Sequence, residues 1–206
     1  MSVRSAPHDP HRDIHSDAGA VAGEHPGRSS NPVIKVRGLA WLEFSKPDLV
    51  RAEPELVARH FPVDMTRQGI FGHSMGGHGA ITLALKNPDR YASVSAFAPI
   101  AQPSTAGWSR PAFEKYLGPD ERSWRAYDAT LLIADGYRVK DLLVDQGTAD
   151  GFLEEGLRPQ LLEIACAAAG IPLELQMREG YDHSYNFIST FMAQHIAWHA
   201  ERLAKG

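Results

Sequence analysis

The distribution of apolar residues along this chain of 206 residues predicts alternating short strands and helices. Small, β-branched and other apolar residues indicate strands at residues 91–98, 140–147 and 173–177. Helical periodicity covers residues 157–169 and 185–203. Strand–helix alternation of this kind is typical of a parallel sheet with helices on both faces, so we expect an α/β fold.

The N-terminal part of the chain lacks this alternation. Residues 1–32 are rich in His, Asp, Ser, Gly and Pro without regular periodicity, so we expect an unstructured leader there. A short strand is expected at residues 33–36, and Pro47 and Pro54 interrupt the segment before the helix end at residues 55–61.

Two segments in the middle of the chain are less regular. Residues 101–118 are rich in Pro, Ser and Gly and carry Trp108, which predicts a loop or lid rather than core. Residues 123–133 carry a helical pattern that ends near an Asp-Gly pair.

The most informative stretch is residues 68–79, QGIFGHSMGGHG. Gly72, Ser74 and Gly76 form the pattern Gly-x-Ser-x-Gly between an apolar run and a helix-forming run, the context of a nucleophile elbow. A Cβ atom at either glycine would collide with the backbone in so tight a turn. The turn would direct the backbone N–H of Met75 toward negative charge that develops near the serine. A glycine-rich helix start capped by serine is the alternative interpretation.

A serine nucleophile needs a base, and in this type of sheet the partners follow later strands in the order serine, acid, histidine. Asp150 follows the strand at 140–147, and His183 follows the strand at 173–177. We therefore expect the catalytic set Ser74, Asp150 and His183, with Asp150 fixing the tautomer of the imidazole.

Other residues compete for these roles. Asp141 and Asp145 lie within or at the end of a strand, and Asp182 is interpreted as a loop hydrogen-bonding residue. His73 and His78 flank the elbow but are tied closely to its backbone, which makes them poor candidates for the base.

Histidine pairs raise the question of a metal site. His195 and His199 are four residues apart on a predicted helix, but the residue after His195 is Ile rather than Glu, so the metalloprotease pattern fails. His8, His11 and His15 lack a spaced second pair of ligands. We therefore expect neither a metal nor another cofactor.

Composition narrows the class of protein. The formal net charge is −4 without a Lys/Arg stripe, so nucleic acid is not an expected partner. Cys166 is the single cysteine, so no internal disulfide is possible, which favours a reducing compartment. Its side chain is expected to be buried in a helix. The N-terminus lacks the apolar core of a secretory signal, and we expect neither a membrane span nor a membrane partner.

Several long motifs resemble the S-formylglutathione hydrolase family, also called esterase D. They are FPVD at 61–64, GIFGHSMGGHGA at 69–80, SVSAFAPI at 93–100, YDAT at 127–130, DQGTADGFL at 145–153 and GYDHSYNFI at 180–188. The resemblance runs from about Pro54 to the C-terminus. It implies an α/β-hydrolase fold, a cytoplasmic enzyme of formaldehyde detoxification and a homodimer. The implied reaction is hydrolysis of S-formylglutathione to formate and glutathione, with Ser74, Asp150 and His183 as the triad.

The chain departs from the family before residue 54. The family has further strands there and a loop reading like Ser-Gly-Leu-Thr-Cys that supplies a second oxyanion N–H, and residues 1–53 contain no such loop. We therefore expect residues 33–206 to form a partial α/β-hydrolase domain after the leader. A broad short-acyl esterase and an inactive truncated remnant remain alternatives, and Trp108 is a candidate glutathione contact.

Overall fold

The computed structural model describes residues 33–35 and 47–205, with side chains described from residue 54 onward. Within this part of the chain, one sheet holds five strands in the order β1-β2-β3-β4-β5, and every neighbouring pair is parallel. The strands are β1 (Val33–Lys35), β2 (Gln68–His73), β3 (Tyr91–Phe97), β4 (Leu142–Gly147) and β5 (Leu173–Arg178). The predicted α/β fold with a parallel sheet is confirmed, whereas the predicted leader at 1–32 lies outside the described residues.

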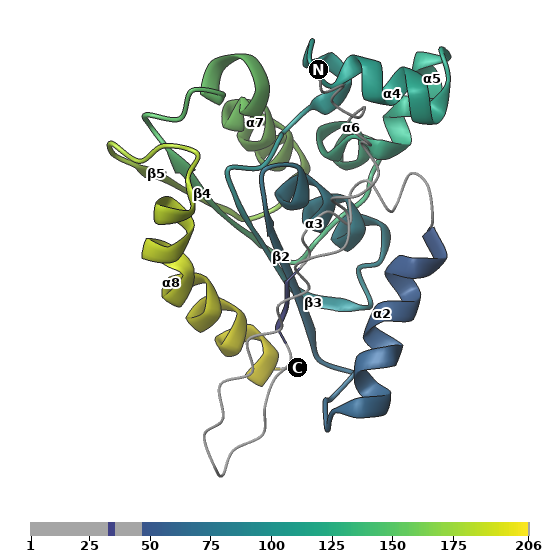
Figure 1. Ribbon diagram of the computed structural model, residues 1–206, viewed down its shortest axis with the longest axis vertical. Coiled ribbons are helices and arrows are strands. Elements are labelled where there is room, and N and C mark those ends of the chain that lie inside the picture. The colour runs from purple at the N-terminus through teal and green to yellow at the C-terminus, as the bar shows by residue number, and fades with distance from the viewer. Residues whose placement is uncertain (1–32, 36–46, 206) are drawn as a thin grey trace, which may run out of the picture.

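Helices cover both faces of the sheet (Figure 1). Buried residues of α3, α6 and α7 pack on one face, and α8 packs on the opposite face. The α-helices are α2 (Pro47–His60), α3 (Met75–Lys86), α4 (Arg110–Leu117), α5 (Glu121–Trp124), α6 (Ala129–Ala134), α7 (Pro159–Ala169) and α8 (Tyr185–Ala204). Shorter turns are η1 (Pro103–Thr105), η2 (Arg125–Tyr127) and the π-helical turn η3 (Leu153–Leu157).

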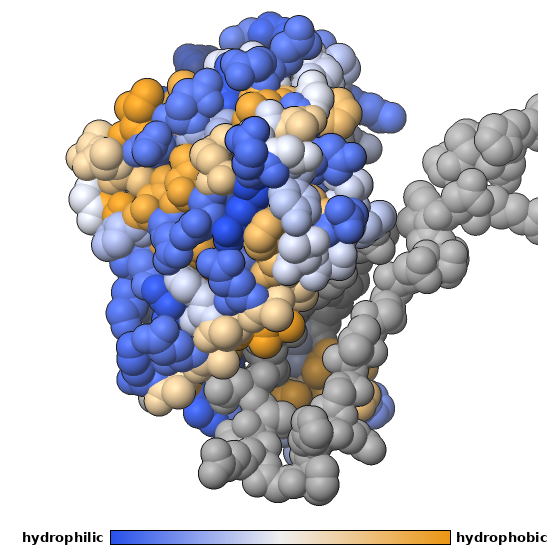
Figure 2. Space-filling model, turned by 90° about the vertical axis from the view of Figure 1, so that its left-hand side faces the viewer, coloured by the Kyte–Doolittle hydropathy of each residue, from blue (hydrophilic) through white to orange (hydrophobic). Residues whose placement is uncertain are grey.

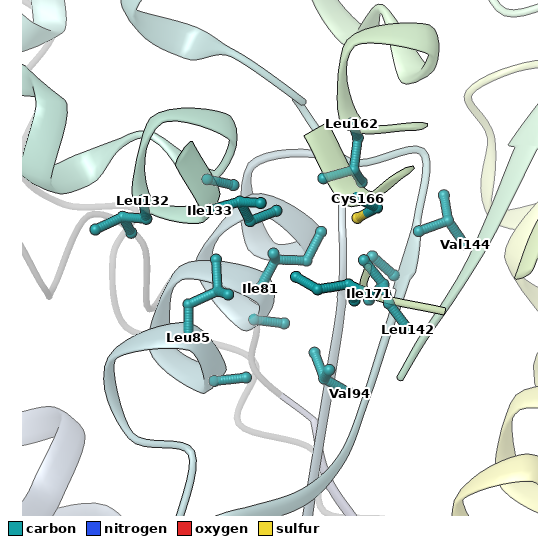
Figure 3. Packing of buried hydrophobic residues seen from close by; sticks show 14 of the residues in the cluster. Ile81, Leu85, Val94, Leu132, Ile133, Leu142, Val144, Leu162, Cys166 and Ile171 are labelled. Atoms are coloured by element: carbon teal, nitrogen blue, oxygen red, sulfur yellow. The ribbon is translucent and has the colours of Figure 1, made fainter. Parts of the chain in front are cut away.

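The face covered by α3, α6 and α7 is an apolar core. Ile81 and Leu85 of α3 lie among Val94 of β3, Ile133 of α6 and Leu142 of β4, all almost fully buried (Figure 3). Such burial contributes about 1.5–3 kcal/mol for each large side chain. This cluster therefore holds α3, α6 and α7 on the sheet mainly through apolar packing.

Cys166 belongs to the same core. Its side chain is buried in α7, as the sequence predicts, and burial raises the pKa of its thiol to about 11. The thiol is therefore kept protonated and unreactive near neutral pH.

The opposite face is polar where α8 crosses β3 and β4. His195 and His199 lie one turn apart on α8, so their side chains point to the same side of the helix. Both imidazoles are fully buried, and they bond the hydroxyls of Ser93 and Ser95 on β3. A Cβ atom on Gly69 of β2 would lie 2.7 Å from Ser93 Oγ and 2.8 Å from His199 Nδ1, so glycine leaves the space that this pair occupies.

Two expectations about the middle of the chain are wrong in part. Residues 101–118 are not all loop, because α4 forms and its Phe113 is buried edge-on against Trp124, with ring centroids 5.4 Å apart. The helical pattern at 123–133 is interrupted at Asp128, whose carboxylate accepts hydrogen bonds from the backbone N–H groups of Thr130 and Leu131. This capping starts α6 afresh at Ala129.

The segment before β2 also differs from expectation. The sequence predicts that Pro47 and Pro54 interrupt this segment, but both lie within α2, with Pro47 as its first residue. Proline is readily accepted at the first position of a helix because that N–H has no partner within the helix.

The face of the molecule that carries α8 is mainly hydrophilic, with apolar residues in separate patches (Figure 2). Ile196 of α8 and Met177 of β5 are among the exposed apolar residues. Within the described ranges, none of the helices combines the length and the apolar character that crossing a bilayer requires.

The burial of His199 predicts a stability that depends on pH. Desolvation first, and then the nearby His195 and Arg202, lower the pKa of His199 from 6.5 to about 3. The unfolded chain binds this proton more readily, so this group's effect on the free energy of unfolding is absent above pH 6.5 and becomes destabilising as pH falls toward about 3. At pH 5 the loss from this group is about 2 kcal/mol.

Urea unfolding between pH 7.5 and pH 5 measures this effect. His199→Asn should flatten the dependence of unfolding free energy on pH, whereas the exposed control His60→Asn should leave the slope of the parent protein. Equal slopes in all three proteins would contradict the assignment.

Candidate active site

Ser74 lies at the turn between β2 and α3 in a backbone conformation that is rare for serine. Its φ is 56° and its ψ is −119°, so it lies in the positive-φ region where glycine is usual. The surroundings hold this strained conformation, because Ser74 N donates to Phe97 O at 2.9 Å and Ser74 O accepts from His78 N at 3.0 Å. A Cβ atom on Gly72 would collide with the carbonyl of Gly76, as expected for an elbow.

Met75 is the first residue of α3. The first backbone N–H groups of a helix have no acceptor within it and lie at the positive end of the helix dipole. The sequence-predicted donor therefore sits at a helix N-terminus directly after Ser74.

Asp150 and His183 are in direct contact. His183 Nδ1 donates to Asp150 Oδ2 at 2.6 Å, and the Asp150 side chain is fully buried. Phe152 N donates to Asp150 Oδ1 at 2.9 Å, and Gln146 Nε2 donates to Oδ2 at 3.3 Å. Because Nδ1 carries the proton that is donated to the carboxylate, a neutral His183 ring has an unprotonated Nε2 that can accept a proton.

The imidazole of His183 is also held by two other rings. Its centroid lies 4.3 Å from that of His73 and 5.1 Å from that of Phe152. Because His73 immediately precedes Ser74, the contact brings the His183 ring beside the elbow. Phe152 was missed at the sequence level, although its place two residues after Asp150 is a usable signal.

The loops that carry Asp150 and His183 are fastened to one another. Ala149 N donates to Tyr181 O at 3.0 Å, and Thr148 N donates to Arg178 O at 3.0 Å. A Cβ atom on Gly147 would collide with the Tyr181 carbonyl, so only glycine allows the two backbones to approach this closely.

The competing aspartates have other partners. Asp141 Oδ2 lies 2.8 Å from Arg202 Nη2, and the buried Asp145 pairs with Arg178 at 2.8 Å. Asp182 accepts from Ser184 N at 3.1 Å, and hydrogen bonds from the Ser184 side chain and backbone lower its pKa. Asp182 is thus a loop hydrogen-bonding residue, as interpreted.

The competing histidines His78, His195 and His199 also have other hydrogen-bond partners. Both ring nitrogens of the buried His78 bond backbone carbonyls, those of Ile100 and Tyr127. His195 and His199 bond serines under the sheet, and the described residues contain no group of three or more His, Cys, Asp or Glu that could hold a metal.

The segment that carries Trp108 packs against η3. Gly156 lies so close to the Trp108 indole that an added Cβ atom would be 2.7 Å from Nε1, and Trp108 as a residue is 52% exposed. Arg158 has a positive φ of 46°, and its Nη2 donates to Gln102 O at 2.8 Å and Thr105 Oγ1 at 2.7 Å. These contacts fix the predicted lid segment against η3 and the start of α7, but η3 and Arg158 were not found from the sequence.

Comparison with known proteins agrees with this geometry. A family model described as "Putative esterase" matches residues 23–200. The chain is 54% identical over 153 residues to S-formylglutathione hydrolase of Mus musculus and 52% identical over 150 residues to that of Paracoccus denitrificans. These matches cover 73% of this chain but only 54% and 53% of those proteins, so the chain spans about half the length of these curated relatives.

Solved structures show the same relationship. The S-formylglutathione hydrolase of Agrobacterium tumefaciens has 57% identity and a TM-score of 0.73, over 79% of this chain and 57% of that one. The Staphylococcus aureus enzyme has 21% identity and a TM-score of 0.61, over 75% and 63%, which supports the α/β-hydrolase fold alone. The resemblance noted in the sequence is confirmed, and the chain belongs to the esterase family whose model matches residues 23–200.

Proposed function

We propose that this chain carries the catalytic half of a serine thioesterase whose substrate is S-formylglutathione. The observation that carries the proposal is the 2.6 Å bond between His183 Nδ1 and Asp150 Oδ2, beside an elbow with Ser74 at positive φ. The high identity to S-formylglutathione hydrolases supports the substrate.

In the proposed mechanism, His183 Nε2 takes the proton of Ser74 as Oγ attacks the formyl carbon. The negative charge on the carbonyl oxygen is met by the backbone N–H of Met75 at the start of α3. The imidazolium is stabilised by Asp150, whose orientation is fixed by Phe152 N and Gln146 Nε2. Collapse of the tetrahedral intermediate expels the thiolate of glutathione, which the imidazolium protonates.

The second half of the reaction uses the same groups. His183 takes a proton from water, the hydroxide attacks the formyl ester on Ser74, and formate leaves as the serine recovers its proton. A thiol has a pKa near 8.5, so the leaving group needs little help from an acid. This favours a thioester over an alkyl ester at a site of this kind.

The resemblance supports a cytoplasmic location and a homodimer as parts of the same proposal. The single cysteine is consistent with a reducing compartment. No cofactor takes part in the proposed reaction.

Substitution of the triad tests the chemistry. Ser74→Ala should lower kcat for S-formylglutathione by on the order of 10⁶-fold and Asp150→Asn by about 10⁴-fold, as in other serine hydrolases. Release of the glutathione thiol measures the rate, and circular dichroism checks that the variants fold. Activity retained by a folded Ser74→Ala protein would exclude the mechanism.

The acyl and thiol parts of the substrate test the choice between a dedicated thioesterase and a broad esterase. A formyl group offers little surface for recognition, so the proposal predicts that selectivity comes from the glutathione side. We expect kcat/KM for S-formylglutathione to exceed that for an aryl acetate by at least about 100-fold. Comparable values would favour the broad short-acyl esterase.

A third possibility, an inactive remnant, has to be considered because residues 1–53 contain no recognisable second oxyanion loop. One missing oxyanion donor lowers turnover by about 10²–10³-fold in a comparable enzyme, and such a loss leaves measurable activity. Absence of turnover in the parent chain with the His183–Asp150 bond intact would favour the remnant.

A further inference from the structure

Three hydrogen bonds link buried serines of β3 with buried histidines of α8. Ser93 Oγ lies 2.7 Å from His199 Nδ1, His199 Nε2 lies 2.7 Å from Ser95 Oγ, and Ser95 Oγ lies 2.8 Å from His195 Nδ1. His195 Nε2 then faces Asp145 Oδ1 at 3.6 Å, which is an electrostatic contact rather than a hydrogen bond. These five residues, here called the buried relay, are at most 2% exposed.

Arg178 fixes the position of the Asp145 carboxylate at the end of the buried relay. Arg178 Nε and Nη2 donate to its two carboxylate oxygens at 2.8 and 3.2 Å. Arg178 is itself held by Gln194 Oε1 at 2.6 Å and by the ring of Phe191, 4.0 Å from its guanidinium carbon. Arg178 thus holds the Asp145 carboxylate in place beside His195.

One order of protons is compatible with all three hydrogen bonds between the serines and histidines of the buried relay. A carboxylate facing His195 Nε2 favours the proton on that nitrogen, which leaves Nδ1 to accept from the Ser95 hydroxyl. Ser95 then accepts from His199 Nε2–H, and His199 Nδ1 accepts from Ser93. The depressed pKa of His199 agrees with this order because it keeps the ring neutral, with a single N–H.

The buried relay links the elements that carry the candidate site. Ser95 is on β3, whose Phe97 carbonyl holds Ser74 N, and Asp145 is on β4, which leads to Asp150. His195 is on α8, which begins directly after the loop that carries His183. The His195 ring also stacks on Phe97, with centroids 3.8 Å apart and planes 21° apart.

We propose that His195 is a positioning residue for the catalytic site, which fixes α8 against β3 and β4 so that His183 stays aligned with Asp150 and Ser74. This inference rests on the proposed function for its kinetic consequence. Burying a polar group costs free energy unless the group is hydrogen-bonded. The polar contacts therefore favour one position of α8 on the sheet, whereas apolar packing alone is less specific. A misplacement of about 1 Å at reacting groups can lower a rate by about 10²-fold.

Two substitutions of His195 separate its contacts. His195→Phe keeps an aromatic ring that can pack on Phe97 but removes both imidazole nitrogens. His195→Asn can still bond Ser95 through its amide but does not reach Asp145. Leu203→Ala is the matched control, because Leu203 is fully buried on the same helix and is not a member of the buried relay, so its loss destabilises the protein through packing alone.

The decisive measurement is nuclear magnetic resonance of the imidazoles. In the parent chain, ¹⁵N shifts should report His195 and His199 as Nε2–H tautomers, and the His183 Nδ1 proton should give a low-field signal from its short bond to Asp150. His195→Phe should weaken or shift the His183 signal and lower kcat for S-formylglutathione by about 10- to 100-fold with KM little changed. His195→Asn should recover part of both, and Leu203→Ala should leave both unchanged.

The outcomes distinguish this inference from the proposed function. If the parent chain does not turn over substrate, the His183 signal alone still decides whether His195 positions that ring. An unchanged His183 signal in a folded His195→Phe protein, or an equal change in Leu203→Ala, would overturn the inference. If His195→Phe does not fold, an unchanged signal in His195→Asn overturns it instead, and so does an Nδ1–H tautomer at His195 in the parent chain.

Discussion

The parallel direction of the five strands is the constraint on which the rest of this molecule depends. Because every strand points the same way, the residues that follow β2, β4 and β5 all emerge at one edge of the sheet. Ser74, Asp150 and His183 are far apart in sequence but each follows a strand at that edge. The contact between the last two is therefore a consequence of topology, and the local turns only refine it.

The two faces of the sheet contribute differently to this arrangement. The face under α3, α6 and α7 is apolar and supplies packing without a strict directional requirement. The face under α8 contains buried histidines, serines and an ion pair, whose bonds have direction. An apolar face gives stability, whereas a polar face of this kind specifies how α8 sits and, through it, where the His183 loop begins.

The sequence predicts those elements and site residues that neighbouring residues in the chain signal. The elbow around Ser74 follows from glycine spacing between a strand and a helix, and Asp150 and His183 follow from their places after strands. The burial of Asp145, His195 and His199 was missed because it depends on how α8 docks on the sheet, which local periodicity does not encode. The π-helical turn η3 and the positive φ of Arg158 likewise depend on tertiary packing against the lid segment.

Reaction with a fluorophosphonate tests the central claim most directly, since it needs an assembled elbow and a working base but no particular substrate. The account predicts covalent labelling of the parent chain at Ser74 alone, identified by mass spectrometry, with the rate reduced strongly in His183→Gln. A folded parent chain that is not labelled at Ser74, or one labelled equally fast without the His183 imidazole, would contradict it.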